Sequence, residues 1–230
     1  MSQHDEHGPR VLKHGLASRL FHWGLIFGFL PAAITGFIIW LKPGSEDLVN
    51  LSMRIHIIGA TILTASAILY TIFALDRIIS FVRLIFTWGK GDIEWMKVGG
   101  GYPQKMFLGK EIPVPPMDKM NSGQKMMGIM MLVGGIFLIT TGWVLYAFLP
   151  VTPKAFAYWA DQIHLWVGIV LGLSMFAHIG LGIYNWGEFK AMFGDGTQPL
   201  SEAEHHNPEW VKNKIETVSG AQTPGAKISG

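Results

Sequence analysis

The amino-acid sequence predicts an all-α membrane protein, an up-down bundle of four transmembrane helices. Half of the 230 residues are hydrophobic and only 15% are charged, whereas about a quarter are charged in a soluble domain. The apolar residues gather in four segments, at residues 20–41, 51–75, 123–149 and 158–184. Each has the roughly 20 residues that a helix needs to cross a bilayer. Backbone groups in lipid must pair within their own segment, so these segments are predicted to be helices.

The distribution of Lys and Arg orients the bundle. Basic residues flank the first span on its N-terminal side and crowd the segment between the second and third spans. They are Arg10, Lys13, Arg19, Arg77, Arg83, Lys90, Lys97, Lys105, Lys110 and Lys119. The two short connections carry only Lys42, Arg54 and Lys154. By the positive-inside rule both termini and the long middle loop are cytoplasmic. We therefore expect a multi-pass protein of the bacterial inner membrane, with short periplasmic loops.

These features divide the chain into three parts. Residues 1–19 form a cytoplasmic N-terminus, without the pattern of a cleaved signal peptide. Residues 20–185 form the transmembrane domain, including a cytoplasmic loop at about 76–122, whose Gly- and Pro-rich stretch predicts an ordered or partner-bound loop. Residues 186–230 form a cytoplasmic tail, and its last part, residues 219–230, is predicted to be disordered.

The amino-acid composition limits which cofactors and binding partners the chain can have. The chain has no cysteine, which excludes disulfides, Cys-ligated iron–sulfur clusters, thiolate zinc sites and covalently attached haem. A formal net charge of +2 does not indicate nucleic acid binding. Any redox centre must therefore use His, Met or a dissociable cofactor.

Four of the nine histidines lie within the predicted spans: His22, His56, His164 and His178. Ionisable groups in a membrane are costly and usually face the bundle interior with a partner. His164 and His178 are 14 residues apart, which is about 21 Å along a helix and about 40° around it. The alternating direction of the helices places His22 at the depth of His178, and His56 at the depth of His164.

Two facing imidazoles in an apolar bundle suit the two axial positions of a b-type haem. The sequence therefore predicts that the bundle holds two haems, one bound by His22 and His178 and the other by His56 and His164. Two His ligands leave iron no open position, which favours electron transfer. Small residues near these histidines, Gly36, Gly59, Ala60 and Gly168, fit either clearance for a cofactor or ordinary packing between membrane helices.

Six motifs carry a family resemblance. They are SRLFHW, MRIHIIGA, NSGQKMM, QIHLWVG, MFAHIG and HHNPEWVKNKI. Together, over about residues 19–215, they resemble the gamma subunit of respiratory formate dehydrogenases, the membrane-anchoring dihaem cytochrome b subunit of a molybdenum or tungsten enzyme. The resemblance implies the same two histidine pairs as haem iron ligands. It also implies a quinone site on the cytoplasmic side at Asn121, Gly123 and Gln124.

The resemblance implies electron transport in anaerobic respiration. Electrons from formate would enter on the periplasmic side from an iron–sulfur subunit and reduce menaquinone or ubiquinone on the cytoplasmic side. The dehydrogenase chemistry would belong to another subunit, and the complex would form a higher-order oligomer. Two departures from the family, Ser122 in place of Ala and a long middle loop, leave the catalytic partner open. The residues alone favour an N-cap at Asn121 or Ser122, with Gln124 or Lys125 in the first turn, and a cap and a quinone site can coexist there.

Two rival functions remain at this point. The chain could be the cytochrome b subunit of a hydrogenase or of another molybdoenzyme, because nothing in the transmembrane motifs distinguishes these complexes. A rival from another class is a transporter that binds transition metals through its histidines. Such transporters usually bring carboxylates into their spans as well.

Overall fold

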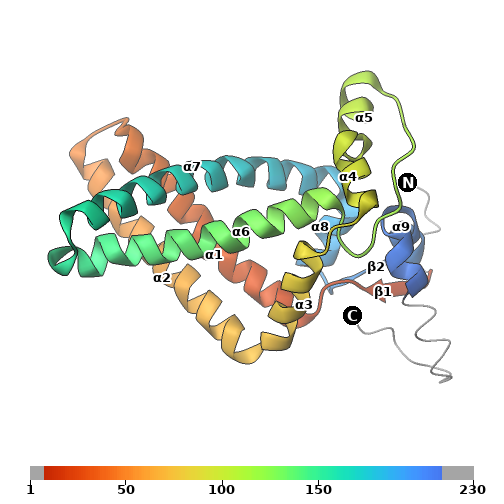
Figure 1. Cartoon of the computed structure of the whole chain (residues 1–230), viewed down its shortest axis with the longest axis horizontal. Coiled ribbons are helices and arrows are strands. Elements are labelled where there is room, and N and C mark those ends of the chain that lie inside the picture. Colours follow the sequence, from red (N-terminus) through yellow and green to blue (C-terminus); the bar gives the residue numbers. More distant parts are fainter. Residues whose placement is uncertain (1–7, 214–230) are drawn as a thin grey trace. The chain divides into compact units, whose positions relative to one another are not determined.

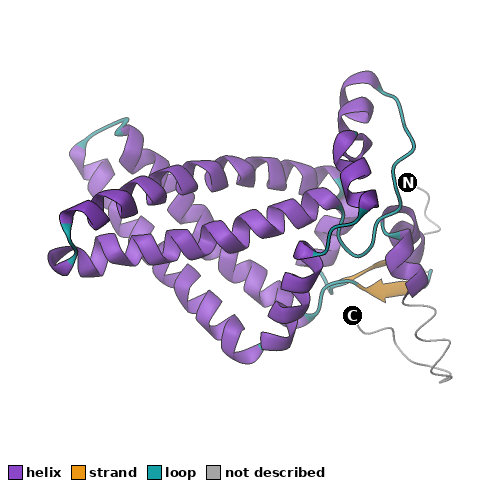
Figure 2. Ribbon diagram, in the orientation of Figure 1, coloured by secondary structure: helices purple, strands orange, loops and turns teal. Residues whose placement is uncertain are grey.

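The computed structural model describes residues 8–213. The segment predicted to be disordered, residues 219–230, lies outside the described residues. The described chain is mostly helical, with one two-stranded sheet (Figures 1 and 2). It separates into two compact units. We call residues 20–78 and 129–181 the four-helix unit, and residues 1–19, 79–128 and 182–230 the mixed unit.

Four long helices confirm the predicted spans. They are α1 (Leu16–Leu41), α2 (Glu46–Phe73), α6 (Ser122–Trp143) and α7 (Lys154–Tyr184). Each is long and apolar enough to cross a membrane, α6 together with the π-helical and 3₁₀ turns that extend it to Val151. The connection between α1 and α2 and that between α6 and α7 lie at the same end of the bundle (Figure 1). The four helices therefore run alternately up and down.

The second helix begins earlier than predicted. The sequence analysis began this span at residue 51, but α2 begins at Glu46. The side chain of Ser45 caps it by accepting a hydrogen bond from the Leu48 N–H at 3.3 Å. Glu46 and Asp47 lie in the first turn, where carboxylates interact favourably with the helix dipole. Hydropathy alone missed this polar first turn.

Close backbone contacts hold the four-helix unit together. Phe29, Leu63 and Leu171 form its buried core. A Cβ placed on Gly28 would lie 2.7 Å from the Leu63 nitrogen, and one on Gly59 would lie 2.6 Å from the Gly28 carbonyl oxygen. These glycines let α1 and α2 approach closely, as small residues do between membrane helices. For Gly59 the packing interpretation is therefore the one that the structure supports.

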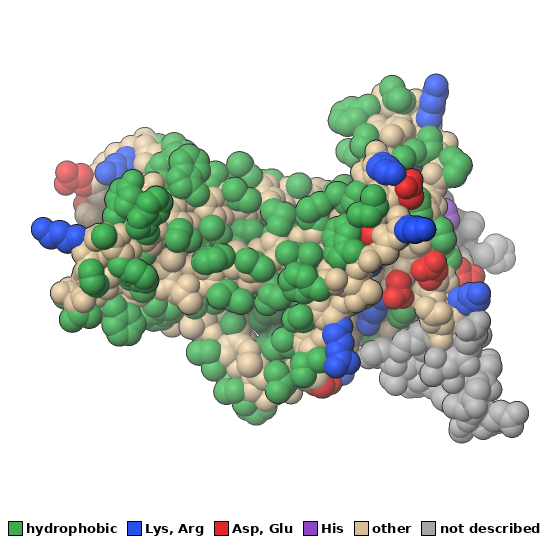
Figure 3. All heavy atoms as spheres, in the orientation of Figure 1, with side chains coloured by type: hydrophobic (Ala, Val, Ile, Leu, Met, Phe, Trp, Pro, Cys, Tyr) green, Lys and Arg blue, Asp and Glu red, His purple; other side chains and the backbone are tan. Residues whose placement is uncertain are grey.

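The outer surface of these helices is apolar. Large side chains such as Phe27, Ile58, Ile136 and Phe176 are 57–64% exposed. Hydrophobic side chains cover the visible length of the four helices, and charged ones gather away from their middle (Figure 3). A soluble monomer rarely exposes apolar patches larger than a few hundred Å², so this surface fits contact with lipid tails.

The middle loop contains more helix than predicted. It forms α3 (Leu75–Phe86), α4 (Lys90–Lys97), a 3₁₀ turn at Gly99–Gly101 and α5 (Tyr102–Leu108). The Gly- and Pro-rich stretch, which was expected to be an ordered or partner-bound loop, includes the short helix α5. The three glycines take positive φ angles of 58°, 62° and 75° and turn the chain, after which Pro103 occupies the first turn of α5, where its missing N–H costs nothing. Gly109, with φ 63°, ends the helix.

The ends of the described chain meet in the mixed unit. Strand β1 (Arg10–Leu12) pairs antiparallel with β2 (Thr197–Pro199), and β2 lies between α8 (Trp186–Phe193) and α9 (Leu200–His206). Val11, Ala203, Trp210 and Val211 form a small core. The ammonium group of Lys13 is buried here, where it contacts Glu188 and donates to Asn207 Oδ1 at 2.8 Å. Burial lowers the pKa of Lys13 although Glu188 opposes the shift.

Candidate functional site

Two pairs of histidines face each other in the four-helix unit, where His22, His56 and His164 are half-buried and His178 is exposed. The rings of His22 on α1 and His178 on α7 have centroids 6.3 Å apart, at an interplanar angle of 58°. Those of His56 on α2 and His164 on α7 are 6.0 Å apart, at 68°. The structure thus brings the four histidines together in the two pairs that topology and spacing predict. Helix α7 contributes one member of each pair.

The ring separations fit a metal ion between the imidazoles. A first-row metal ion lies about 2 Å from a histidine nitrogen, so two imidazoles on opposite sides of one ion have centroids roughly 6 Å apart. Both pairs have this separation. Each pair could therefore hold a metal ion, such as the iron of a haem, through its two imidazoles.

A backbone carbonyl orients His56. Its Nδ1 lies 2.8 Å from the Ala32 carbonyl oxygen. A carbonyl oxygen can only accept, so Nδ1 carries the hydrogen and donates it. Nε2 then keeps its lone pair and can bind a metal. Ligating histidines commonly donate their other N–H in this way, which fixes the tautomer and the ring orientation.

A threonine has the same role beside His164. The Thr141 hydroxyl donates to the Phe137 carbonyl at 2.6 Å, so its oxygen can accept from His164 Nδ1, which is 3.0 Å away. His164 thereby has Nε2 available as a ligand as well. Neither Thr141 nor the Ala32 carbonyl was identified from the sequence. A carbonyl gives no sequence signal, whereas Thr141 could have been found as a polar residue in an apolar span.

Glycines border the His56–His164 pair. A Cβ on Gly36 would lie 3.4 Å from His56 Cε1, which agrees with the depth predicted for Gly36. A Cβ on Gly142, which the sequence analysis did not single out, would lie only 3.0 Å from His164 Cε1. By contrast, a Cβ on Gly172 would meet Phe37 at 2.7 Å, and one on Gly168 would make an ordinary contact with Leu138 at 3.8 Å. Clearance beside the imidazoles therefore comes from Gly36 and Gly142.

The comparison with protein families agrees with this arrangement. The model of prokaryotic cytochrome b561 matches residues 13–195, which is most of the chain and includes all four histidines. The chain belongs to the prokaryotic cytochrome b561 family. It is therefore a membrane-bound b-type cytochrome that works in electron transfer. No curated protein matches the chain. The residues matched by the family model do not include β2 or α9.

At the start of α6, the second candidate site of this cytochrome forms a capping box. The Gln124 N–H donates to Asn121 Oδ1 at 2.9 Å, and the Asn121 N–H donates to Gln124 Oε1 at 3.0 Å. The capping role of Asn121 and Gln124 is thus confirmed. Both bonds use the amide oxygens and leave the two NH₂ groups as donors, for which the described residues supply no acceptor. Capping and ligand binding are compatible at these residues.

Gly123 lies under the indole of Trp95. A Cβ at this position would be 3.1 Å from Trp95 Cη2 and 3.3 Å from Asn121 Oδ1. Trp95 itself is only 7% exposed. A side chain at position 123 would therefore crowd Trp95 of α4, which would have to move by a few tenths of an ångström.

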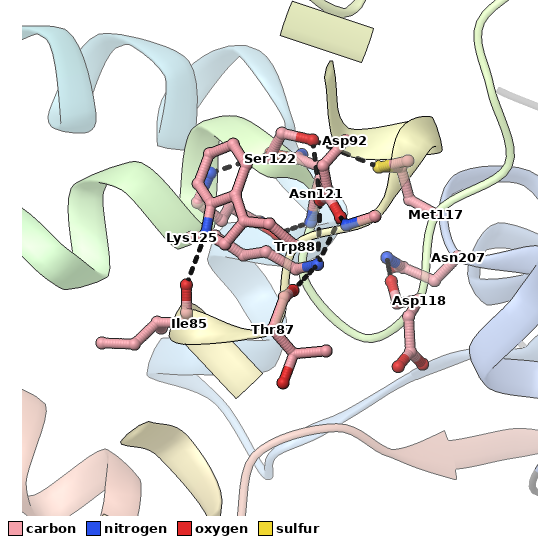
Figure 4. A network of polar contacts seen from close by, with 12 residues as sticks. Ile85, Thr87, Trp88, Asp92, Met117, Asp118, Asn121, Ser122, Lys125 and Asn207 are labelled. Atoms are coloured by element: carbon pink, nitrogen blue, oxygen red, sulfur yellow. Dashed lines mark hydrogen bonds and ion pairs between the residues drawn. The ribbon is translucent and has the colours of Figure 1, made fainter. Parts of the chain in front are cut away.

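A buried ion pair lies beside the capping box (Figure 4). Lys125 Nζ is 2.8 Å from Asp92 Oδ1 and 3.0 Å from Oδ2, and both side chains are 8% exposed. The hydroxyl of Ser122 donates to Asp92 Oδ1 at 2.9 Å. Burial by itself raises the pKa of Asp92, but hydrogen bonds from Lys125, the Gly89 N–H and Ser122 outweigh it and leave the pKa below its ordinary value. Sequence reasoning missed this pair because its members are distant in the chain.

Proposed function

We propose that the chain is the membrane-anchoring, dihaem cytochrome b subunit of a formate dehydrogenase-like complex. In this proposal it carries electrons from a periplasmic iron–sulfur subunit to a quinone on the cytoplasmic side. The main support for the proposal is that the imidazoles face each other in two pairs. The ring centroids of each pair are separated by the distance expected when both rings bind the same metal ion. Two b-type haems, when bound, would supply one-electron transfer across the bilayer.

The residues of this chain bind and orient those groups. His22 and His178 would hold one haem iron, and His56 and His164 the other. Ala32 and Thr141 keep the hydrogen of their imidazole partners on Nδ1 and so direct Nε2 toward the iron. With both histidines of a pair as its ligands, a haem iron would keep no open position for oxygen, which would favour electron transfer over oxygen chemistry.

The proposed quinone site lies at the start of α6. The NH₂ groups of Asn121 and Gln124 would donate hydrogen bonds to a quinone carbonyl, and Gly123 lets the backbone approach it. By the orientation rule this helix begins on the cytoplasmic side. Quinone reduction there would take its protons from the cytoplasm and help to generate a proton-motive force.

The proposed partners follow from the family resemblance. They are an iron–sulfur electron-transfer subunit and a molybdenum- or tungsten-containing catalytic subunit, in a higher-order oligomer in the inner membrane. The runner-up is a cytochrome b subunit of a hydrogenase or another molybdoenzyme. Purifying the chain from its own membranes in mild detergent and identifying the catalytic subunit by its metal and substrate distinguishes these two. Formate-dependent reduction of the haems is the result expected.

A set of single substitutions tests the haem assignment. His22, His56, His164 and His178 are each changed to Ala, with exposed His205→Ala as the control, and haem per chain is measured from the reduced-minus-oxidised spectrum. Wild type and H205A should hold two haems. The losses should fall into two spectral groups, H22A with H178A and H56A with H164A. Any other grouping would contradict the proposed pairs, and a wild-type protein that holds no haem but binds divalent metal would favour the transporter.

A further inference from the structure

Helix α4 braces the first turn of α6 with two side chains. Asp92 and Trp95 are three residues apart, so they lie on one face of α4, and they are only 6% and 7% exposed. Asp92 contacts Ser122 and Lys125, and Trp95 packs where a side chain at position 123 would lie. We call these two residues the α4 brace.

The carboxylate of Asp92 has little freedom. Its Oδ1 accepts from Ser122 at 2.9 Å, and its Oδ2 accepts from the Gly89 N–H at 2.9 Å. Lys125 Nζ contacts both oxygens and also donates to the Thr87 carbonyl at 2.9 Å. The dashed lines of Figure 4 show this network linking α4 to the beginning of α6. Two of the three donors, Ser122 and Lys125, belong to α6 and fix the carboxylate relative to that helix.

The α4 brace contacts the immediate sequence neighbours of the proposed quinone donors. It holds Ser122, Gly123 and Lys125, whereas Asn121 and Gln124 occupy the positions before and between them. A shift of the first turn of α6 would therefore move both amides together, with their capping box intact. The capping box fixes the two amides relative to the backbone of the first turn of α6, so the position of their NH₂ groups depends on the brace that holds this turn.

The fact that Asp92 and Lys125 form a buried ion pair also points to a geometric role. A buried ion pair is often no more stabilising than apolar residues of the same size. A pair that served only stability could be replaced by such residues without loss. Three directed hydrogen bonds to one carboxylate, by contrast, fix a position.

We propose that Asp92 and Trp95 are positioning residues for quinone, which hold the start of α6 so that the NH₂ groups of Asn121 and Gln124 converge on one quinone carbonyl. The inference rests on the proposed quinone site. It gives the long middle loop a role in that site.

Binding of a fluorescent hydroxyquinoline N-oxide, a quinone analogue, tests the proposal on the purified, haem-loaded full chain. Asp92→Asn should weaken binding by roughly 10- to 100-fold, the loss expected when two hydrogen bonds to the quinone carbonyl are misaligned. Glu94→Gln is the matched control, because Glu94 lies on the same helix in an exposed ion pair with Lys97, and it should bind as wild type does. Haem content should stay unchanged in both variants.

Ser122→Ala provides a milder variant, because it removes one hydrogen bond to Asp92 and leaves the ion pair. Its binding should fall between that of wild type and that of D92N. With a soluble quinol as electron donor, the apparent KM for haem reduction should rise in the same order, while the rate at saturating quinol stays near the wild-type rate. A role limited to stability would lower the unfolding temperature without this change in KM.

Asn121→Ala and Gln124→Ala separate the inference from the function on which it rests. If these two variants lose binding but D92N and S122A bind normally, the positioning role is wrong and the quinone site stands. If wild type does not bind the analogue, or N121A and Q124A bind it as wild type does, the quinone site itself is wrong and the positioning role falls with it. Loss of binding in N121A, Q124A and D92N, with graded loss in S122A, supports both.

Discussion

Gly142→Ala provides a sharp test of the His56–His164 haem site. The added methyl group would lie 3.0 Å from Cε1 and 3.5 Å from Nδ1 of His164. In the absence of a metal, the imidazole could turn away from this methyl group at the cost of its hydrogen bond to Thr141. A ligated imidazole cannot turn, because iron holds Nε2 and Thr141 holds Nδ1. The substitution should therefore weaken haem binding far more than it affects the apoprotein.

The contact distance gives the size of the effect. Extra methyl groups in a well-packed core usually cost about 1–3 kcal/mol. If that cost falls on the haem-bound state, haem affinity drops by roughly 5- to 150-fold, because each 1.4 kcal/mol corresponds to a factor of ten. Replacing Gly by Ala in a helix also gains about 0.5–1 kcal/mol of helix stability, in the haem-bound and haem-free states alike, so this gain does not alter the affinity.

Gly135→Ala controls for helix stability, since it lies on the same helix and its added Cβ would have no described atom within 4 Å. Haem titration into the haem-depleted proteins, followed by absorbance, should give two equivalents for wild type and G135A. For G142A one equivalent should bind normally and the second should bind weakly, and a further His56→Ala change should cause little extra loss of haem. Full affinity at both sites in G142A would refute a haem held by His164 in this geometry.

Two other predictions concern hydrogen-bond partners. Thr141→Val removes the acceptor for His164 Nδ1 and should lower affinity at that haem site by roughly 10- to 100-fold, the usual effect of losing such a partner. Thr140→Val, which removes a hydroxyl bonded only to its own helix, should leave haem titration unchanged, and equal losses in both would contradict the role of Thr141. Asp92→Asn leaves the buried Lys125 without its counter-ion and should destabilise the fold by about 3–5 kcal/mol at pH 7. Because the pKa of Asp92 is lowered in the folded state, its contribution is complete above the unfolded pKa of about 3.9 and disappears as pH falls through the folded pKa. Thermal unfolding of D92N and wild type should therefore converge in acid, and a constant difference down to pH 3 would argue against the ion pair.

The part of the fold that the sequence predicts well is the part that the bilayer constrains. Apolar segments of sufficient length must become helices in lipid, and the distribution of basic residues fixes their alternating direction. The pairing of His22 with His178 and of His56 with His164 then needs only helix geometry. These steps depend on local sequence, which explains why the structure has the same pairs.

Features that depend on distant contacts could not be predicted in this way. Asp92 looks like an ordinary surface residue of a polar loop until α4 packs on the start of α6. The carbonyl of Ala32 orients His56 only because α1 and α2 approach closely, a contact that depends on the absence of a side chain at Gly28 and Gly59. Gly59 was therefore ambiguous from the sequence, since clearance for a cofactor and close packing both require a small residue.

The orientation of His56 links helix packing to function. The approach of α1 to α2, which the glycines allow, also brings the Ala32 carbonyl to His56 Nδ1 at 2.8 Å. A residue larger than Gly at position 28 or 59 would separate the helices and lengthen this hydrogen bond. The tautomer that leaves Nε2 free to bind iron would then lose its support. Packing residues that do not bind the metal themselves thus help to decide whether an imidazole can bind it, so changes at Gly28 and Gly59 should appear in the haem spectrum as well as in stability.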